Sequence, residues 1–134
     1  MNWWMLAGGL MALICAVGHG VSGRTMFYRP IGSAITSDFY AGVFAGMWHL
    51  ITINFALSAL ALLVLAFPFL PFAAGGGGLG RQNAAAWLIA AQFAGYAAIY
   101  LAISLRLGGA WKLFQWLPFA ATAILVSGGA MAGH

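Results

Sequence analysis

Charged residues are almost missing from this chain. Only 4% of its 134 residues are Asp, Glu, Lys or Arg, and Asp38 is the single acid. So few charges cannot cover the surface of a water-facing enzyme domain of useful size. The five basic residues are spread along the chain and form no patch, which argues against a nucleic-acid surface despite a pI of about 9.9. The composition instead predicts one integral membrane domain over residues 1–134.

Cysteine and acidic side chains are also too few for several kinds of site. Cys15 is the only cysteine, so no intrachain disulfide can form, and we expect it to be a packing residue in an apolar helix. A catalytic triad needs an acid to orient the base that activates the nucleophile, and a proton path often uses several carboxylates. With one acid in the chain, neither is expected, which argues against an enzyme without excluding one. A metal site built from Cys15, His19 and His49 is conceivable, but the spacing is not diagnostic. The N-terminus lacks the basic region of a cleavable signal peptide, so we expect the first helix to be retained.

Long apolar stretches are what the sequence has instead. No charged residue lies between Asp38 and Arg81. About twenty apolar residues cross a ~30 Å hydrocarbon core. Residues 39–67 exceed that length, so this helix should tilt or project past one interface. Pro68 and Pro71 are expected to end it. Similar stretches predict further helices at about residues 3–22, 84–105 and 113–131.

These four helices predict an all-α, antiparallel up-down bundle with two longer connections. Residues 23–38 are expected to form an interfacial loop, because apolar and aromatic residues alternate there with Arg24 and Arg29. At its end, Ser37 or Asp38 should cap the second helix, and Asp38 could pair with either arginine. Residues 68–83 are expected to form a flexible Pro/Gly-rich loop.

The basic residues predict the orientation of the bundle. Arg24, Arg29, Arg106 and Lys112 fall in the first and third loops, and only Arg81 falls in the second. The positive-inside rule therefore places the first and third loops in the cytoplasm of a bacterium and both termini in the periplasm. Because the third loop is short, the last two helices should be antiparallel neighbours.

Small and polar residues predict which helix faces turn inward, since in lipid small faces pack closely and polar groups avoid hydrocarbon. In the first helix a four-residue repeat of small residues marks this face. In the second helix His49 and Thr52 share a face with small residues, while Phe55 and Leu62 lie on the opposite side. In the third helix polar residues recur every four positions. The repeat in the first helix is Gly8, Ala12, Ala16 and Gly20. The small residues of the second helix are Gly42, Ala45, Gly46, Ala56 and Ala59. The polar repeat of the third helix is Gln92, Tyr96, Tyr100 and Ser104.

His49 is the main candidate for a functional residue. It is expected to point into the bundle and to meet the polar stripe of the third helix at similar depth. An ionisable residue in a membrane span is a functional-site candidate. The alternative is a neutral imidazole that holds neighbouring helices together through a hydrogen bond. His19, close to the expected end of its helix, should be near water.

Three ligand-based hypotheses follow from these polar residues. His19 and His49 could ligate a b-type haem, although their expected depths differ by ~9–10 Å at 1.5 Å per residue. Histidine and tyrosine side chains, including Tyr96 and Tyr100, could instead bind the head of a quinone. His49 could also titrate in a small solute or proton transporter. The remaining hypothesis is structural: the polar groups hold the helices in register, and the outer faces bind a larger complex.

Two groups of motif residues look familiar together. They are Gly18-His19, Gly23-Arg24 and Arg29-Pro30-Ile31 in the first group, and Trp48-His49-Leu50-Ile51-Thr52 in the second. They resemble those of a family of small bacterial four-helix membrane proteins with a Gly-His helix end, a basic loop with proline and a Trp-His pair in the second helix. The resemblance covers roughly the first half of the chain and implies no activity. It implies that the segment from His19 to Pro30, together with Trp48 and His49, is where a site should be sought.

Taken together, the sequence predicts a multi-pass protein of the bacterial inner membrane. We expect it to act as an accessory or scaffold subunit, with the lipid bilayer and a protein partner or a second copy on its Gly/Ala faces. The alternatives are a haem- or quinone-binding redox component using His19 and His49, and a small transporter. No nucleic-acid partner is expected.

Overall fold

The chain folds into four helices. A computed structural model describes residues 1–67, 79–111 and 114–132, without the side chains of residues 79–82. In these ranges there is no strand, which confirms the predicted all-α four-helix fold. The first helix is continuous through two π-helical segments and a final α-helical turn. The elements are α1 (Trp3–Val17), η1 (Gly18–Ser22), η2 (Arg24–Tyr28), α2 (Arg29–Ala34), α3 (Asp38–Ala66), α4 (Leu79–Arg106) and α5 (Trp116–Ala132).

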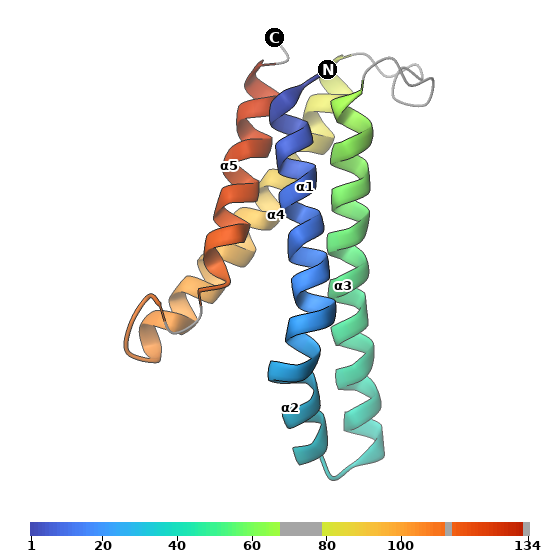
Figure 1. Ribbon diagram of the computed structural model, residues 1–134, viewed down its shortest axis with the longest axis vertical. Helices are drawn as coiled ribbons and strands as arrows, with labels where there is room; N and C mark the ends of the chain where they lie inside the picture. Colours follow the sequence, from blue (N-terminus) through green and yellow to red (C-terminus); the bar gives the residue numbers. More distant parts are fainter. Residues whose placement is uncertain (68–78, 112–113, 133–134) are drawn as a thin grey trace.

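Successive helices run antiparallel, as the sequence predicts. At one end of the bundle the Asn2 N–H donates to the Ala66 carbonyl at 2.9 Å, and the Asn2 side chain donates to the Gly129 carbonyl at 3.0 Å. Further along, His19 lies beside Thr52. The beginning of α1 therefore meets the ends of α3 and α5, and the two chain termini lie at the same end of the molecule (Figure 1).

Helix α1 packs against both α3 and α5, and its glycines permit the close approach. A Cβ added at Gly8 would lie 2.8 Å from Val126 Cγ2, and one at Gly9 would lie 3.0 Å from the Leu63 side chain. Gly8, Ala12 and Ala16 are all buried. The predicted stripe of small residues on the first helix is thus confirmed as a packing face.

Aromatic side chains fill the space between α3, α4 and α5. The ring of Phe55 lies 5.7 Å from Phe93 and 5.3 Å from Phe119, measured between centroids. Phe55 and Leu62 are 2% and 0% exposed, so placing them on the lipid side was wrong. Ala56, predicted to face inward, is exposed. Large rings rather than small residues form this interface because α3 and α4 do not approach each other closely.

The predicted loop at residues 23–38 is wrong for most of its length. The first helix continues to Ala34, and only a short turn separates it from α3. Wider turns precede Pro30: the Gly23 N–H donates to the Gly18 carbonyl and the Arg29 N–H to the Arg24 carbonyl. Proline lacks an N–H and crowds the carbonyl four residues earlier, so widened turns allow the helix to pass it.

The other helix boundaries differ less from the prediction. α3 and α5 match the predicted spans to within about three residues. α4 begins at Leu79 rather than residue 84, because a polar first turn can precede an apolar run and carries no hydrophobic signal. The predicted loop therefore shortens at residues 79–83. Its remainder, residues 68–78 with Pro68, Pro71 and the glycine run, lies outside the described residues.

Helix length makes this fold suitable for a bilayer. The spans Trp3–Ala34, Asp38–Ala66 and Asn83–Arg106 are long and apolar enough to cross a membrane, while Trp116–Ala132 is shorter. The first helix and α3 continue past the turn that joins α4 to α5 (Figure 1). We call this two-helix projection, residues 24–47, the hairpin extension.

Candidate functional site

His19 is held between two residues of α3, just before the hairpin extension begins. Its ring stacks on the indole of Trp48, with centroids 4.0 Å apart and planes inclined by 22°. His19 Nδ1 lies 2.8 Å from Thr52 Oγ1. The Thr52 hydroxyl donates its one hydrogen to the Trp48 carbonyl at 3.1 Å. When the Thr52 hydrogen goes to Trp48, the Thr52 oxygen accepts from the Nδ1–H tautomer of His19.

The predicted position of His19 near a wet helix end is wrong. Because the first helix continues to Ala34, His19 lies in the middle of a continuous helix and is half-buried. An edge of its ring also meets Phe55, with centroids 5.7 Å apart. This contact connects His19 to the aromatic core.

Gly23, between the two π-helical segments, allows the first helix to lie close to α3. Gly23 is buried, and a Cβ there would lie 2.8 Å from Trp48 Cζ2. A Cβ at Gly20 would lie 3.6 Å from Thr52 Cγ2, which is ordinary contact. Only Gly23 is therefore required by the close approach of the indole.

A cavity of about 210 Å³ lies between the π-helical segments and α3. Its walls are Gly20, Arg24, Tyr28, Trp48, His49 and Thr52. The ring of Tyr28 lies 5.6 Å from Trp48 and 6.1 Å from His49 between centroids, so it joins the two sides. Arg24 and His49 are exposed, which means that the cavity opens to the surroundings. We call it the Arg24–His49 cavity.

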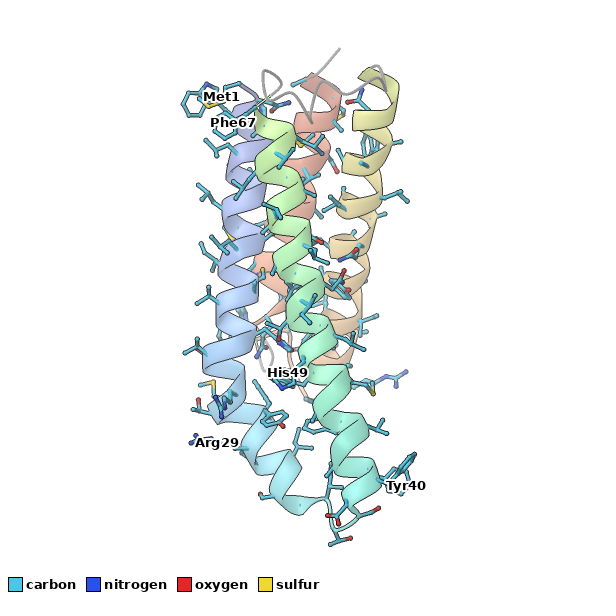
Figure 2. The ribbon with its side chains drawn as sticks, turned by 90° about the vertical axis from the view of Figure 1, so that its right-hand side faces the viewer. Met1, Arg29, Tyr40, His49 and Phe67 are labelled. Carbon is cyan, nitrogen blue, oxygen red and sulfur yellow. The ribbon has the colours of Figure 1, made fainter. Side chains whose placement is uncertain are left out.

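The predicted inward position of His49 is wrong. The buried face of α3 contains Phe55, Ser58 and Ala59. His49 follows Trp48 by one position, about 100° around the helix, and this turns it to the open side of the cavity. Figure 2 shows His49 near the level where α4 ends and α5 begins. It therefore lies at the junction between the four-helix part and the hairpin extension.

The cavity contains a positive charge without a carboxylate beside it. Asp38, the only acid, lies about 16 Å from His49 along α3 at 1.5 Å per residue. No ion pair joins Asp38 to Arg24 or to Arg29. α3 begins at Asp38 with Ser37 at the N-cap position, as predicted, but the Ser37 side chain makes no capping hydrogen bond. Arg29 is exposed and lies on the outer side of the first helix, away from the cavity (Figure 2).

The polar stripe of α4 turns inward, as predicted, but its partners are not His49. Asn54 Nδ2 donates to the Tyr96 hydroxyl at 2.7 Å, and Gln92 Nε2 donates to Ser58 Oγ at 3.4 Å. Tyr100 packs on Phe119 with centroids 5.5 Å apart. Sequence reasoning missed Asn54 and Ser58, although their four-residue spacing matches that of Gln92 and Tyr96 in an antiparallel pair. This cluster holds α3 and α4 in register.

The positions of the histidines and the size of the cavity bear on the metal and haem hypotheses. Within the described residues, no three His, Cys, Asp or Glu side chains gather closely enough to hold a metal ion. Cys15 is buried in α1. The expected depth difference between the histidines was wrong, since His19 contacts Thr52, one turn from His49. However, the cavity is smaller than the ~300–1,000 Å³ pockets that enclose whole ligands. It has room for a polar head group rather than a macrocycle.

Comparison with protein-family models, curated proteins and solved structures found no match to this chain.

Proposed function

We propose that this chain is a multi-pass protein of the bacterial inner membrane that binds the polar head of an amphiphilic molecule in the Arg24–His49 cavity. The observation that supports this function is the grouping of Arg24, Tyr28 and His49 around one open cavity of head-group size. A redox role with a quinone as the amphiphile falls within this proposal.

The depth of the cavity supports the proposal. Twenty residues counted back from Ala66 reach Met47 and span about 30 Å, which is the thickness of the hydrocarbon core. Trp3 and Trp4 are exposed at the opposite end, where aromatic rings favour the interface. In a bilayer the residues Trp48 to Thr52 would then lie just inside the other boundary. A head group bound there keeps its tail in the hydrocarbon.

The side chains of the cavity suit a head that accepts hydrogen bonds. Arg24 offers a planar fork of donors, Tyr28 a hydroxyl and His49 a ring nitrogen. Trp48 supplies an apolar floor whose position is fixed by the stacked His19. The tail would lie along exposed apolar residues next to the cavity, among them Leu50.

The orientation is part of the same proposal. The segment η2–α2, which carries Arg24 and Arg29, and the end of α4 at Arg106 lie toward the end of the molecule opposite to the termini (Figure 1). By the positive-inside rule this end would be cytoplasmic. The cavity would then open at the cytoplasmic boundary of the membrane.

Extraction of the purified protein tests this function. Lipids and quinones retained after mild solubilisation should be identified by mass spectrometry for the wild type, Arg24→Gln and Arg29→Gln. We expect one class of amphiphile to be enriched over the bulk membrane, retained by Arg29→Gln and depleted in Arg24→Gln. Arg29 is a matched control because it is exposed on the same helix outside the cavity. A retained fraction identical to the bulk membrane in all three proteins would overturn the proposal.

A second candidate function is that of an accessory or scaffold subunit, or of a self-associating protein. It is favoured by the hairpin extension, where Gly42 and Gly46 have no side chain or other helix within 4 Å of an added Cβ. Such a face could receive a helix of a partner or a second copy. Gly46→Leu should then lower the size of the complex in native electrophoresis, whereas Gly95→Leu, on an equally open face of α4, should not. A wild-type protein that migrates as a monomer without partners would contradict this function.

A further inference from the structure

We infer that the molecule bound in the Arg24–His49 cavity carries an anionic group, a phosphate or a carboxylate, and that Arg24 is its main ligand. This inference rests on the proposed function and names the chemical class of the head group. It depends on the charge, the donor inventory and the size of the cavity.

The charge of the cavity is not balanced by the chain. Arg24 is the one charged side chain among the lining residues. The single acid of the chain, Asp38, is remote and forms no ion pair with Arg24. At the edge of the hydrocarbon, a guanidinium is less well hydrated than in bulk water, and its attraction for an anion is stronger because the dielectric constant is lower. An anionic head group supplies the missing counter-charge.

The donors in the cavity outnumber the acceptors that remain available. The Thr52 hydroxyl already has two partners within the chain, the Trp48 carbonyl and His19 Nδ1. Arg24 can only donate, and Tyr28 and His49 can each donate as well. The planar fork of an arginine matches two oxygens of a phosphate or carboxylate in a bidentate arrangement. A head group rich in oxygen acceptors therefore fits better than one that must donate.

The size of the cavity agrees with this class. A volume of about 210 Å³ is below the ~300–1,000 Å³ of the pockets that enclose whole ligands. A phosphate or carboxylate with some of its hydrating water molecules fits this space. The rest of the molecule must leave through the open side between Arg24 and His49.

Two sources can supply such a group: the head of an anionic lipid and a soluble anion that enters from water. Native mass spectrometry of the full chain separates them with three probes: phosphatidylglycerol, inorganic phosphate and a neutral ubiquinone. Each probe should be titrated against the wild type, Arg24→Gln, Arg24→Lys and the control Arg29→Gln. Circular dichroism should show that all variants keep the helicity of the wild type.

The expected result is Arg24-dependent binding of an anionic probe. Arg24→Gln should weaken it on the order of tenfold or more, because a charge-assisted hydrogen-bond pair is lost. Arg24→Lys should retain part of the affinity, Arg29→Gln should retain nearly all of it, and added salt should weaken binding. Binding of phosphatidylglycerol without phosphate would identify the lipid head as the source. Binding of phosphate alone would identify a soluble anion; it would support the anion assignment and overturn the proposed binding of an amphiphile.

Other results would overturn the inference and remain distinguishable from failure of the proposed function. If ubiquinone binds in the wild type with the same affinity as in Arg24→Gln, and neither anion binds, the cavity holds a neutral head and only the anion assignment fails. If no probe binds to the wild type, the assignment and the proposed function both fail. Equal loss of anion binding in Arg24→Gln and Arg29→Gln would show only diffuse attraction to surface charge, and this too would overturn the assignment.

Discussion

The contact between Gly23 and Trp48 gives the sharpest test of how the cavity is built. Gly23→Ala would place a methyl group 2.8 Å from Trp48 Cζ2. The indole cannot easily move away, because its ring is stacked on His19 at 4.0 Å. Overpacking of this kind costs about 1–3 kcal/mol. Alanine instead of glycine in a helix recovers roughly 0.5–1 kcal/mol. We therefore expect Gly23→Ala to lose up to about 2.5 kcal/mol of stability, the largest difference between these two terms.

Gly20→Ala is the matched control for this prediction. It lies in the same π-helical region, but its Cβ would meet Thr52 Cγ2 at an ordinary 3.6 Å. We expect its stability to equal or exceed that of the wild type by up to about 1 kcal/mol. Both variants can be unfolded by SDS titration in mild detergent and followed by circular dichroism, with near-ultraviolet signals reporting on the tryptophans. Equal stability of the two alanine variants would refute the close approach of Gly23 to the indole.

Three further predictions test other parts of the structure. Thr52→Val should destabilise the fold by about 1–3 kcal/mol, because the buried side of His19 loses its hydrogen-bond acceptor, while Thr52→Ser should restore most of the loss in thermal unfolding. Tyr96→Phe and Asn54→Leu should each lower the free energy of unfolding by about 1 kcal/mol, because each removes the hydrogen bond between the two side chains. In a double-mutant cycle the double variant should lose less than the sum of the two single variants. Strict additivity would contradict this hydrogen bond. Gly8→Leu should prevent α5 from packing on α1 and reduce the midpoint of thermal unfolding by several degrees, whereas an unchanged midpoint would contradict this packing.

Much of the fold could be predicted from apolar run lengths. A chain with one acid and long uncharged stretches has few arrangements open to it, and short connections make neighbouring helices antiparallel. The inward face of α4 was also predictable, because Gln92, Tyr96, Tyr100 and Ser104 repeat at four-residue spacing. What the run lengths did not reveal was the continuation of the first helix beyond Ser22. The polar and basic residues there predict a loop, although the part of a helix that extends past a hydrocarbon core does not need to be apolar.

The candidate site was harder to predict because it depends on the rotation of α3. His49, rather than Trp48, was expected to face inward, on the rule that small and polar residues form the contacts between membrane helices. In the structure the space between α3 and α4 is filled by Phe55 and other rings, which turns His49 to the open side. Arg24 and His49 line the same cavity because the first helix continues there through π-helical segments. The wider turns of these segments cannot be predicted from the 3.6-residue spacing of an α-helix.

The central claim is that an amphiphile places its head in the Arg24–His49 cavity. The most direct measurement is photolabelling in lipid vesicles with phosphatidylglycerol that carries a diazirine next to its head group, followed by peptide mapping. The account predicts that labels concentrate on residues 20–28 and 48–52 in the wild type, and that Arg24→Gln removes this concentration while Arg29→Gln does not. Labels distributed evenly over the lipid-facing surfaces of α4 and α5, with no excess at the cavity, would contradict the claim.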